Sequence, residues 1–517
     1  MLQIKNVTIT HKKDLRTILQ DFSLVLNDGD KAAIIGEEGN GKSTLLKWIY
    51  DPELIDGYAE GQGERTLNRE RFGYLPQELP VKDGEKTIYE YFAQEPMFVE
   101  LTPKELGKYA KEFHLPADFF YGDQRMGTLS GGEKIKVQMI RLLMAEPSVL
   151  LLDEPSNDID LETLEWLEDM IRRWPHIVLY ISHDETLIEN TANTIIHMEQ
   201  IRRKTLSRYT VVHMPYLQYK QERLNQFERQ EQLAINDRRE KKIRDEKLRR
   251  IEQSVASKLD NISRAERDGV GRRLKKKMKA VKSMEKRFER EDEFMTQMPE
   301  QEEAIFFKLG DKGAAIPAGK TVIDYSLETL STPDGQRILS SHISLNLRGP
   351  EKICIIGTNG AGKTTLLRKM AEELLAREDI HAEYIPQNYE DLLDLNMAPI
   401  DYLDKSGDKQ ERTRIRTFLG SLKYTADEMD HPIAELSGGQ KAKVLLLKMS
   451  LSGANVLILD EPTRNFSPLS GPVIRQMLAQ FPGAIISISH DRKYINEVCT
   501  KVYQLTKTGL MPLQSTN

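Results

Sequence analysis

The sequence carries one ordered set of five short motifs twice, once in each half of its 517 residues. Each set begins with a glycine-rich loop ending in Gly-Lys-Ser or Gly-Lys-Thr, and continues with a glutamine, Leu-Ser-Gly-Gly, Asp-Glu and a histidine. In both sets, 23 residues separate the serine of Leu-Ser-Gly-Gly from the aspartate, and 30 separate the aspartate from the histidine. A single core does not grow to this length, so the matched spacings predict two domains of the same fold.

The glycine-rich loops have the pattern G-x-x-x-x-G-K-[ST]. Residues 32–35 and 352–356 before the loops are typical of strands, and residues 44–48 and 365–369 after them are typical of helices. In this context the loop amides surround phosphate groups at a helix N-terminus, the lysine meets the β- and γ-phosphates, and the hydroxyl holds Mg²⁺. The alternative, a glycine-rich turn with an exposed lysine, would not recur in the same context. The predicted nucleotide-binding residues of the loops are Gly36, Glu37, Glu38, Gly39, Asn40, Gly41, Lys42, Ser43 and Thr44, and Gly357, Thr358, Asn359, Gly360, Ala361, Gly362, Lys363, Thr364 and Thr365.

Each half also contains an apolar run that reads as a buried strand ending in Asp-Glu. The first carboxylate is expected to act on Mg²⁺ through water, and the second to polarise the attacking water. The histidine that follows the next strand is expected to contact the γ-phosphate, because a purely structural histidine would not repeat at the same spacing. The predicted catalytic residues are Glu154, Glu461, His183 and His490, and the predicted metal-site residues are Ser43, Gln77, Asp153, Thr364, Gln387 and Asp460.

In this order the five motifs resemble the ATPase domains of the ABC family. The resemblance covers both halves and implies a head-to-tail dimer of cassettes within one monomeric chain, with ATP between them. Each Ser-Gly-Gly would then close over the ATP held by the other half, with amides of the following helix donating to the γ-phosphate. The residues concerned are Ser130, Gly131 and Gly132, which would face Lys363, and Ser437, Gly438 and Gly439, which would face Lys42.

Two departures from the family pattern affect these sites. The aspartate that normally communicates between the sites is present as Asp160 in the first half, but Ser467 takes its place in the second. Equal turnover at the two sites is therefore in doubt. An aromatic residue that would stack on the purine is also not evident: His11 is a candidate in the first half, with a surface role as the alternative, and the second half has no clear counterpart.

Charge is unevenly distributed along the chain. The net charge is −6, yet residues 201–290 contain 28 Lys and Arg against 13 Asp and Glu, an excess of +15. Residues 214–296 have glycine only at 269 and 271 and repeat apolar residues every seventh position, which predicts an antiparallel α-helical coiled coil with a reach of ~50 Å. A basic excess on a protruding hairpin favours a polyanion as partner over a merely solvated surface. The predicted RNA-binding residues are Arg249, Arg250, Arg272, Arg273, Lys275, Lys276, Lys277 and Lys279.

The predicted fold class is therefore α/β, with two ABC-type P-loop domains joined by a long antiparallel α-helical hairpin. The expected boundaries are 1–205 for the first ATPase domain, 206–300 for the basic linker with its tip near 254–272, and 301–517 for the second ATPase domain. No apolar run approaches the ~20 residues needed to cross a bilayer, and the two cysteines are not spaced as a disulfide framework or a metal site. These features predict a cytoplasmic protein without a membrane partner.

Tandem cassettes with a basic helical linker resemble the ABC-F family of ribosome-associated ATPases. In that family the linker reaches from the exit-tRNA site toward tRNA and the peptidyl-transferase centre. From Lys42 to Leu129 there are 87 residues, against 73 from Lys363 to Leu436, which leaves little room for the arm of the housekeeping members. An armless form resembles the antibiotic-resistance branch, which implies rRNA and tRNA as partners and ribosome protection as the function. The alternatives are a general translation factor without drug protection, a DNA-binding ABC ATPase and, least favoured, the motor of a transporter.

Overall fold

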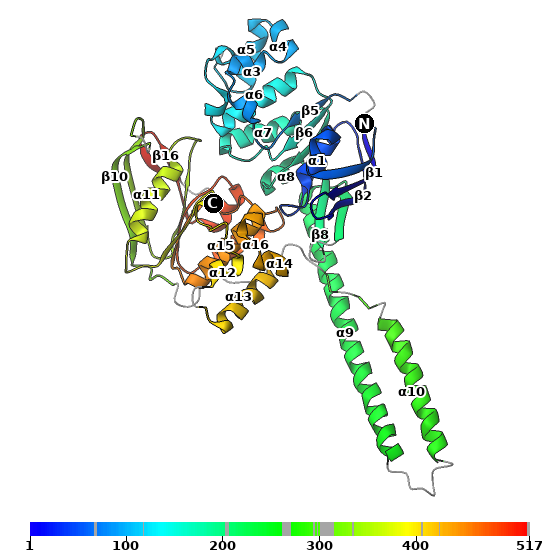
Figure 1. Ribbon diagram of the computed structural model, residues 1–517. Helices are drawn as coiled ribbons and strands as arrows, with labels where there is room; N and C mark the ends of the chain where they lie inside the picture. Colours follow the sequence, from blue (N-terminus) through cyan, green and yellow to red (C-terminus); the bar gives the residue numbers. More distant parts are fainter. Residues whose placement is uncertain are drawn as a thin grey trace. The chain divides into compact units, whose positions relative to one another are not determined.

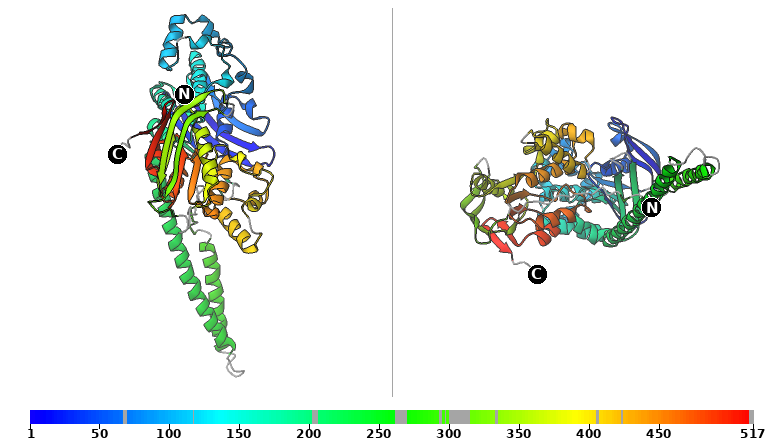
Figure 2. Two further views of the ribbon diagram at one scale, coloured as in Figure 1. Left: turned by 90° about the vertical axis from the view of Figure 1, so that its left-hand side faces the viewer. Right: turned by 90° about the horizontal axis from the view of Figure 1, so that it is seen from below.

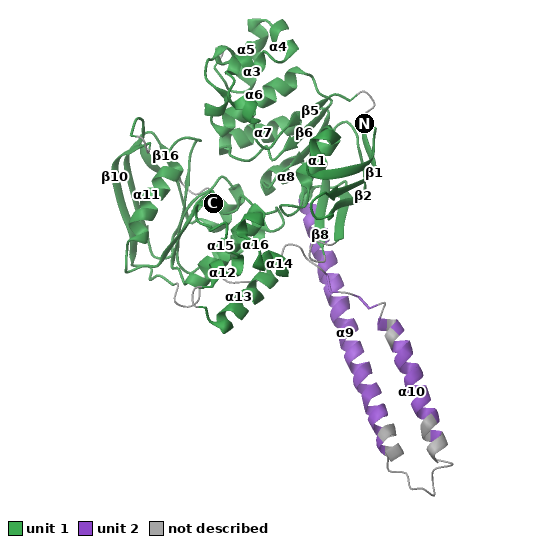
Figure 3. Ribbon diagram, in the orientation of Figure 1, with its two compact units in different colours: residues 1–216, 302–517 green, residues 217–301 purple. Residues whose placement is uncertain are grey.

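The computed structural model describes residues 1–66, 70–116, 118–201, 206–260, 270–292, 295–296, 298–299, 315–332, 335–404, 407–422 and 424–513. The chain divides into two compact units (Figure 3). Residues 1–216 and 302–517 form the first unit, which contains both cassettes, and residues 217–301 form the second. Residues 261–269 of the expected hairpin tip, 254–272, lie outside the described residues, as do the side chains of Arg272 and Lys275.

The first cassette has a six-stranded sheet in the order β5-β6-β7-β3-β8-β9 and an antiparallel sheet in the order β2-β1-β4 (Figure 1). In the larger sheet all neighbours are parallel except β8 and β9. Its strands are β1 (Leu2–His11), β2 (Thr17–Leu26), β3 (Lys31–Ile35), β4 (Ala59–Thr66), β5 (Phe72–Leu75), β6 (Val149–Asp153), β7 (Ile177–Ile181), β8 (Thr194–Ile201) and β9 (Leu206–Val212). Its helices are α1 (Lys42–Tyr50), α2 (Val81–Gly84), α3 (Ile88–Phe92), α4 (Pro96–Glu100), α5 (Pro103–Glu112), α6 (Gly131–Met144), α7 (Leu161–Arg173) and α8 (Glu185–Thr191).

The second cassette repeats this topology, with the sheet order β13-β14-β15-β12-β16-β17 beside the antiparallel pair β10-β11. Its strands are β10 (Thr321–Ser331), β11 (Ile338–Arg348), β12 (Lys352–Ile356), β13 (Ala382–Ile385), β14 (Val456–Asp460), β15 (Ala484–Ile488), β16 (Lys501–Thr506) and β17 (Gly509–Leu513). Its helices are α11 (Lys363–Leu375), α12 (Pro399–Leu403), α13 (Lys409–Ser421), α14 (Ala426–Asp430), α15 (Gly438–Ser452), α16 (Gly471–Ala479) and α17 (Arg492–Val498). The predicted class, α/β with two P-loop domains, is confirmed.

The topology explains why motifs far apart in sequence meet in space. Strands β6 and β7 are buried along their whole length, as expected for parallel strands covered on both faces. Their carboxyl ends lie at one edge of the sheet, beside the loop that joins β3 to α1. Ligand sites in such sheets form at this edge, where the strand order reverses. The Asp-Glu pair and the histidine therefore meet the phosphate loop in each cassette.

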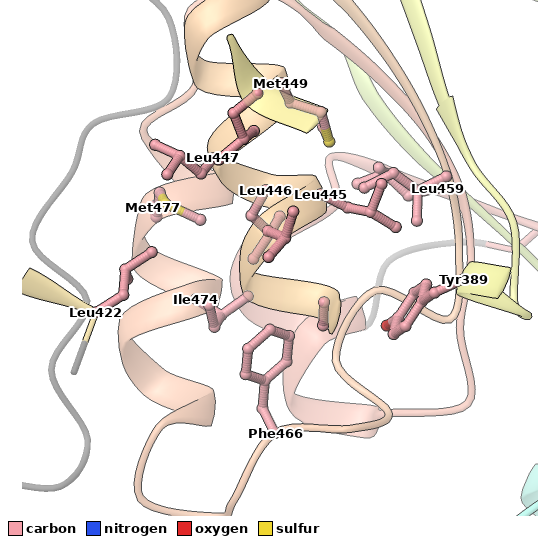
Figure 4. Close-up of a cluster of buried hydrophobic side chains, with 14 of the residues drawn as sticks. Tyr389, Leu422, Leu445, Leu446, Leu447, Met449, Leu459, Phe466, Ile474 and Met477 are labelled. Atoms are coloured by element: carbon pink, nitrogen blue, oxygen red, sulfur yellow. The ribbon is translucent and has the colours of Figure 1, made fainter. Parts of the chain in front are cut away.

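The core of the second cassette holds the loop after its Asp-Glu pair in place. Phe466 belongs to this loop, is 2% exposed, and packs in a buried cluster with Leu446 of α15 and Ile474 of α16 (Figure 4). Burying such a ring stabilises its position by about 1.5–3 kcal/mol relative to exposure. The backbone on either side of Phe466 is thus fixed, including the serine that follows it.

The additional length of the first cassette lies mainly in a strand. Lys42 and Phe72 are 30 residues apart, whereas Lys363 and Ala382, the corresponding positions in the second cassette, are 19 apart. The added residues include β4, which pairs with β1 and extends the antiparallel sheet. They therefore widen a sheet of the cassette.

The linker unit consists of α9 (Tyr216–Asp260) and α10 (Val270–Asp292), which run side by side in Figure 1 and in the left view of Figure 2. Ala234 and Val281 are buried in this unit. Near its base Lys241 forms an ion pair with Asp292 at 2.7 Å, and the Arg244 guanidinium lies 4.5 Å from the Phe288 ring centre. Polar and aromatic groups therefore contribute to the contact between the two helices.

Two details of the linker differ from expectation. The expected reach of ~50 Å corresponds to about 35 residues per helix, whereas α9 and α10 have 45 and 23 residues. The sheet of the first cassette also continues past the expected boundary at 205, since β9 (Leu206–Val212) pairs with β8. In the described part of the chain, no helix is long and apolar enough to cross a membrane.

The two cassettes contact each other through a face of opposite charges. Arg475 of α16 donates to Glu185 of α8 at 2.7 Å, and both side chains are only 3% exposed. On α17, Arg492 pairs with Glu168 of α7 at 2.8 Å, and Lys493 pairs with Glu185 at 3.3 Å. The acids of this face belong to the first cassette and the bases to the second.

Candidate functional site

Both phosphate loops fold around their lysine. Lys42 Nζ donates to the carbonyls of Gly36 at 2.8 Å and Glu37 at 3.1 Å, and Lys363 Nζ donates to its equivalents at 2.7 and 3.1 Å. Gly41 precedes α1 with φ of 85°, a left-handed conformation that disfavours other residues. A Cβ at this position would also collide with Ile18. The loop is thus built around glycine, as close approach of backbone amides to phosphate requires.

The residues predicted to hold a metal lie next to one another. Ser43 Oγ donates to Asp153 Oδ1 at 2.8 Å, and the Tyr74 hydroxyl donates to the other carboxylate oxygen at 3.3 Å. In the second cassette, Asp460 Oδ2 is buried and has no hydrogen-bond partner among the residues that the structure describes. A hydroxyl beside a carboxylate, with an unsatisfied buried oxygen, fits a Mg²⁺ ion that keeps several of its waters.

The surroundings of Glu154 and His183 in the first cassette favour the charged forms of both side chains. His183 Nε2 lies 2.9 Å from Glu154 Oε1, and His183 Nδ1 lies 2.8 Å from the carbonyl of Phe466. Burial opposes ionisation of Glu154, but the charge and hydrogen bond of His183, together with the charges of Lys42 and Arg464, outweigh it and lower the pKa of the carboxyl. Burial also acts against the charged imidazole, but the Glu154 charge and the hydrogen bonds to Glu154 and Phe466 together raise the pKa of His183. The two groups therefore stabilise each other as an ion pair.

The equivalent pair in the second cassette is neutral. His490 Nε2 lies 3.8 Å from Glu461 Oε1, and within the described part of the chain His490 Nδ1 has no hydrogen-bond partner. Burial, followed by the charge of Asp460, raises the pKa of Glu461 to about 8. Burial and then the charge of Lys363 lower the pKa of His490 to about 4. The two duplicated sites thus differ in charge state although their residues match.

A cavity of about 890 Å³ lies at the phosphate loop of the second cassette and is lined from both cassettes. We call it the Lys363 site. The second cassette contributes Asn359, Gly360, Gly362, Lys363, Thr364, Thr365, Gln387, Asp460, Glu461 and His490, and the first contributes Ser130 and Gly131. The structure therefore brings the serine and a glycine of the Leu-Ser-Gly-Gly motif of one cassette to the phosphate loop of the other. Ser130 also caps α6, since the Glu133 amide donates to its hydroxyl.

The corresponding cavity of the first cassette, the Lys42 site, has about 310 Å³. Its lining includes Glu38, Gly39, Gly41, Lys42, Ser43, Thr44, Gln77, Glu154 and His183. Ser437, Gly438 and Gly439 are not among the described residues that line it. Instead, the Gly439 amide donates to a Glu38 oxygen. Helix α15, which begins at the Leu-Ser-Gly-Gly motif of the second cassette, therefore contacts the phosphate loop of the first cassette directly. The two sites are therefore unequal in volume and in how they close.

Several predicted residues support the loops through packing or hydrogen bonds. Asn40 is buried and its amide donates to the Met198 carbonyl at 3.0 Å. Ala361 packs against the core of the second cassette, and a Cβ at Gly132 would lie 2.7 Å from a hydroxyl of α7. Gln387 donates to Asp158 across the cassette boundary at 3.1 Å. These residues hold the loop in shape for the ones that face the cavity.

The predicted RNA-binding residues with described side chains are exposed. They are Arg249 and Arg250 on α9, and Arg273, Lys276, Lys277 and Lys279 on α10. Their charges are thus open to solvent within the linker unit, as contact with a phosphate backbone requires.

Sequence reasoning missed one pair of site residues. Arg16 lines the Lys42 site and Arg337 lines the Lys363 site, each 26 residues before the lysine of its phosphate loop. By the same alignment of the two cassettes, Thr332 is the counterpart of His11, so the second cassette has no aromatic ring at this position. A guanidinium plane can stack on a purine as an aromatic ring does. The matched spacing of the two arginines was the available signal.

A comparison with protein families places these sites among known ATPases. A family model described as ABC transporter matches residues 19–157 and 340–464. These two ranges cover one cassette each and together just over half of the chain. The chain therefore belongs to the ABC transporter family, and it hydrolyses ATP.

Curated relatives narrow the family to its F branch, ABC-F. The ATP-binding protein YdiF of Bacillus subtilis is 27% identical, over 99% of this chain and 80% of its own length. ABC transporter F family member 5 of Arabidopsis thaliana is 25% identical, over 95% of this chain and 73% of its own. Ribosome protection protein VmlR of Bacillus subtilis is 25% identical, over 99% of this chain and 88% of its own.

Solved structures share the fold of the whole chain at low sequence identity. The complex of archaeal ribosomal stalk protein aP1 with ribosome recycling factor aABCE1 matches with a TM-score of 0.58 and 17% identity, over 98% of this chain and 90% of that one. RNase-L Inhibitor matches with a TM-score of 0.56 and 16% identity. At this identity the likeness concerns the fold alone.

Proposed function

We propose that the protein uses ATP to bind the ribosome and to insert its basic linker toward tRNA and the peptidyl-transferase centre, which protects the ribosome from antibiotics. One observation carries the proposal. The same chain combines ATP sites that are lined by both cassettes with a linker whose lysine and arginine side chains are exposed. The relatives support it, because one of them is named a ribosome protection protein. Contact would be with rRNA and tRNA from the exit-tRNA site, in the cytoplasm.

In this mechanism ATP binds the closed arrangement of the cassettes more tightly than the open one, so it shifts the population toward closure. Lys42 and Lys363 would hold the phosphates, and Ser43, Thr364 and the two aspartates would hold Mg²⁺. Glu154 and Glu461 would each orient and deprotonate the attacking water, with His183 and His490 contacting the γ-phosphate. Arg16 and Arg337 would stack on the purine. Loss of the γ-phosphate then lets the cassettes open and the ribosome release the protein.

The double substitution Glu154→Gln with Glu461→Gln should trap the protein on ribosomes. Glutamine keeps the shape and hydrogen bonding of the side chain but cannot take a proton from water. Sedimentation of host ribosomes with ATP should therefore recover the variant with the ribosomes and leave most wild-type protein in the supernatant. A Lys42→Ala, Lys363→Ala variant is the control and should remain free. A double glutamine variant that stays in the supernatant with ATP would contradict ribosome binding.

Drug protection is tested separately from ribosome binding. Expression of the wild-type chain should raise the drug concentration that stops growth of a susceptible host, and the Lys42→Ala, Lys363→Ala variant should not. Unchanged susceptibility to every inhibitor of the peptidyl-transferase centre, together with intact ribosome binding, would leave a general translation factor as the function.

Exposed lysines of α10 should account for part of the salt dependence of binding. Changing Lys276, Lys277 and Lys279 to glutamine removes three charges, so the slope of log affinity against log salt should fall by about 2 if each lysine contacts one phosphate. The matched control changes Lys104, Lys108 and Lys111, which are exposed on α5 of the first cassette. A loss of equal size in both variants would mean that only total charge matters, and not the linker.

A further inference from the structure

The phosphate loop of the first cassette contains two adjacent glutamates. Glu37 and Glu38 occupy the positions of Thr358 and Asn359 in the second cassette, which are uncharged. Carboxylates beside a site for a polyphosphate disfavour binding, since like charges repel more strongly where protein replaces water. Since only one of the two duplicated loops carries these carboxylates, groups elsewhere in the protein must compensate their charge.

Groups of the second cassette compensate the charge of Glu37. It is 7% exposed, and its Oε1 accepts hydrogen bonds from the hydroxyls of Ser467, at 3.0 Å, and Ser470. Its Oε2 pairs with Lys443 of α15 at 3.2 Å. Burial favours the neutral acid, but the Lys443 charge and the serine hydroxyls outweigh it and lower the pKa of Glu37. Glu37 is therefore an ionised side chain held by three groups of the opposite cassette.

Glu38 reaches the signature helix of the second cassette. One of its oxygens accepts a hydrogen bond from the Gly439 amide in the first turn of α15. A Cβ added to Gly438 would lie 2.9 Å from the same carboxyl group. The first-turn amides of this helix are the donors expected to receive the γ-phosphate of ATP in the Lys42 site. In the Lys363 site Gly131, the counterpart of Gly438, lines the cavity.

The contact between Glu37 and Ser467 explains why residue 467 is a serine and not an aspartate. Asp160, its counterpart in the first cassette, faces the amide of Asn359 at 3.4 Å across the boundary. Ser467 faces the Glu37 carboxylate and donates to it. An aspartate at 467 would place two carboxylates together in a buried place, which is strongly unfavourable. The change in the phosphate loop and the change at 467 therefore complement each other.

We propose that Glu37 and Glu38 form an acidic latch that closes the Lys42 site onto the second cassette without nucleotide. Glu38 holds the amide that would otherwise receive the γ-phosphate, so nucleotide enters this site only by displacing the carboxylate. The phosphate loop of the Lys363 site has Thr358 and Asn359 in place of the two glutamates, so this site binds ATP first. The latch concerns the ATP sites alone, and its test contains no ribosome, so it can fail while the proposed partner stands.

Calorimetric titration of the full chain with Mg²⁺ and a non-hydrolysable ATP analogue tests the latch. Two binding steps should appear, with dissociation constants that differ by on the order of tenfold or more. Lys363→Ala should remove the tighter step and Lys42→Ala the weaker one. Two equal steps in the wild-type chain, or the opposite assignment, would overturn the proposal.

Glu38→Asn, which gives the loop the residue of the second cassette, should tighten the weaker step by on the order of tenfold and leave the tighter step unchanged. The matched control is Glu64→Gln, which removes one exposed negative charge from β4 of the same cassette. An unchanged weaker step in Glu38→Asn, or the same tightening in the control, counts against the latch. Thermal unfolding without nucleotide verifies that each variant is folded.

A double-mutant cycle tests the part played by Glu37. Ser467→Asp should lower the unfolding temperature of the nucleotide-free chain, because it opposes Glu37, and Glu37→Thr should abolish most of that loss. Additive effects of Ser467→Asp and Glu37→Thr would show that the two residues do not interact.

Discussion

Above pH 8, where Glu461 is ionised, Glu461→Gln should lower the ATPase rate of the full chain by about 10²-fold or more, because it removes the general base of the Lys363 site. Glu154→Gln should leave more than half of the rate. The difference follows from the two sites: the Lys363 site is the larger cavity and includes Ser130 and Gly131, whereas Glu37 and Glu38 bind the phosphate loop of the Lys42 site to the second cassette. Steady-state phosphate release by the two single variants measures it.

Nucleotide binding provides the control for this comparison. Both glutamine variants should bind ATP as the wild type does, so a reduced rate reports on chemistry and not on occupancy. If Glu154→Gln abolished turnover as completely as Glu461→Gln, hydrolysis at the two sites would be obligatorily coupled. The acidic latch would then affect binding order without dividing the work between the sites.

Arg475→Leu should destabilise the chain by up to about 3–5 kcal/mol, the usual cost of removing one partner of a buried ion pair, although Lys493 still pairs with Glu185 at 3.3 Å. Arg475 donates to Glu185 and to Glu497, at 2.7 Å each, and its side chain is 3% exposed. The loss should appear in calorimetric unfolding as a lower transition temperature. It should also separate the transitions of the two cassettes, because this pair joins α8 to α16.

The control for Arg475 is Arg412 on α13. Arg412 lies 2.7 Å from Asp401, but the two side chains are 43% and 48% exposed. Arg412→Leu should leave the transition nearly unchanged, since solvent already screens its charge. Changing Arg475 and Glu185 to leucine together should recover much of the loss, because no unpaired charge then stays buried. A single substitution at Arg475 as mild as that at Arg412 would contradict the buried pair.

The duplicated fold was predictable because its evidence is local in sequence. A phosphate loop needs its glycines, lysine and hydroxyl within eight residues, and the strand and helix around it follow from a few apolar positions. The equal spacings from Ser130 to Asp153 and from Ser437 to Asp460 then required the same topology twice. The basic linker was predictable for a similar reason, since helix periodicity and charge excess are properties of one continuous segment.

The contacts of Glu37 and Glu38 were not predictable in this way. Both residues sit at variable positions of the loop pattern, and their role depends on which groups of a distant cassette face them. Ser467 was recognised as a departure, but its reason became visible only with the Glu37 carboxylate beside it. The unequal charge states of Glu154 and Glu461 are likewise set by burial and by the histidine geometry, which a motif does not encode.

The opposite charges on the facing surfaces of the two cassettes favour contact between unlike cassettes over contact between like ones. Glu168, Glu185 and Glu189 lie on the first cassette, and Arg475, Arg492 and Lys493 meet them from the second. If two first cassettes from separate chains met through this face, acid would oppose acid, and two second cassettes would oppose base with base. A half of this chain is consequently a poor partner for its own copy, and the covalent connection supplies each half with the complementary one.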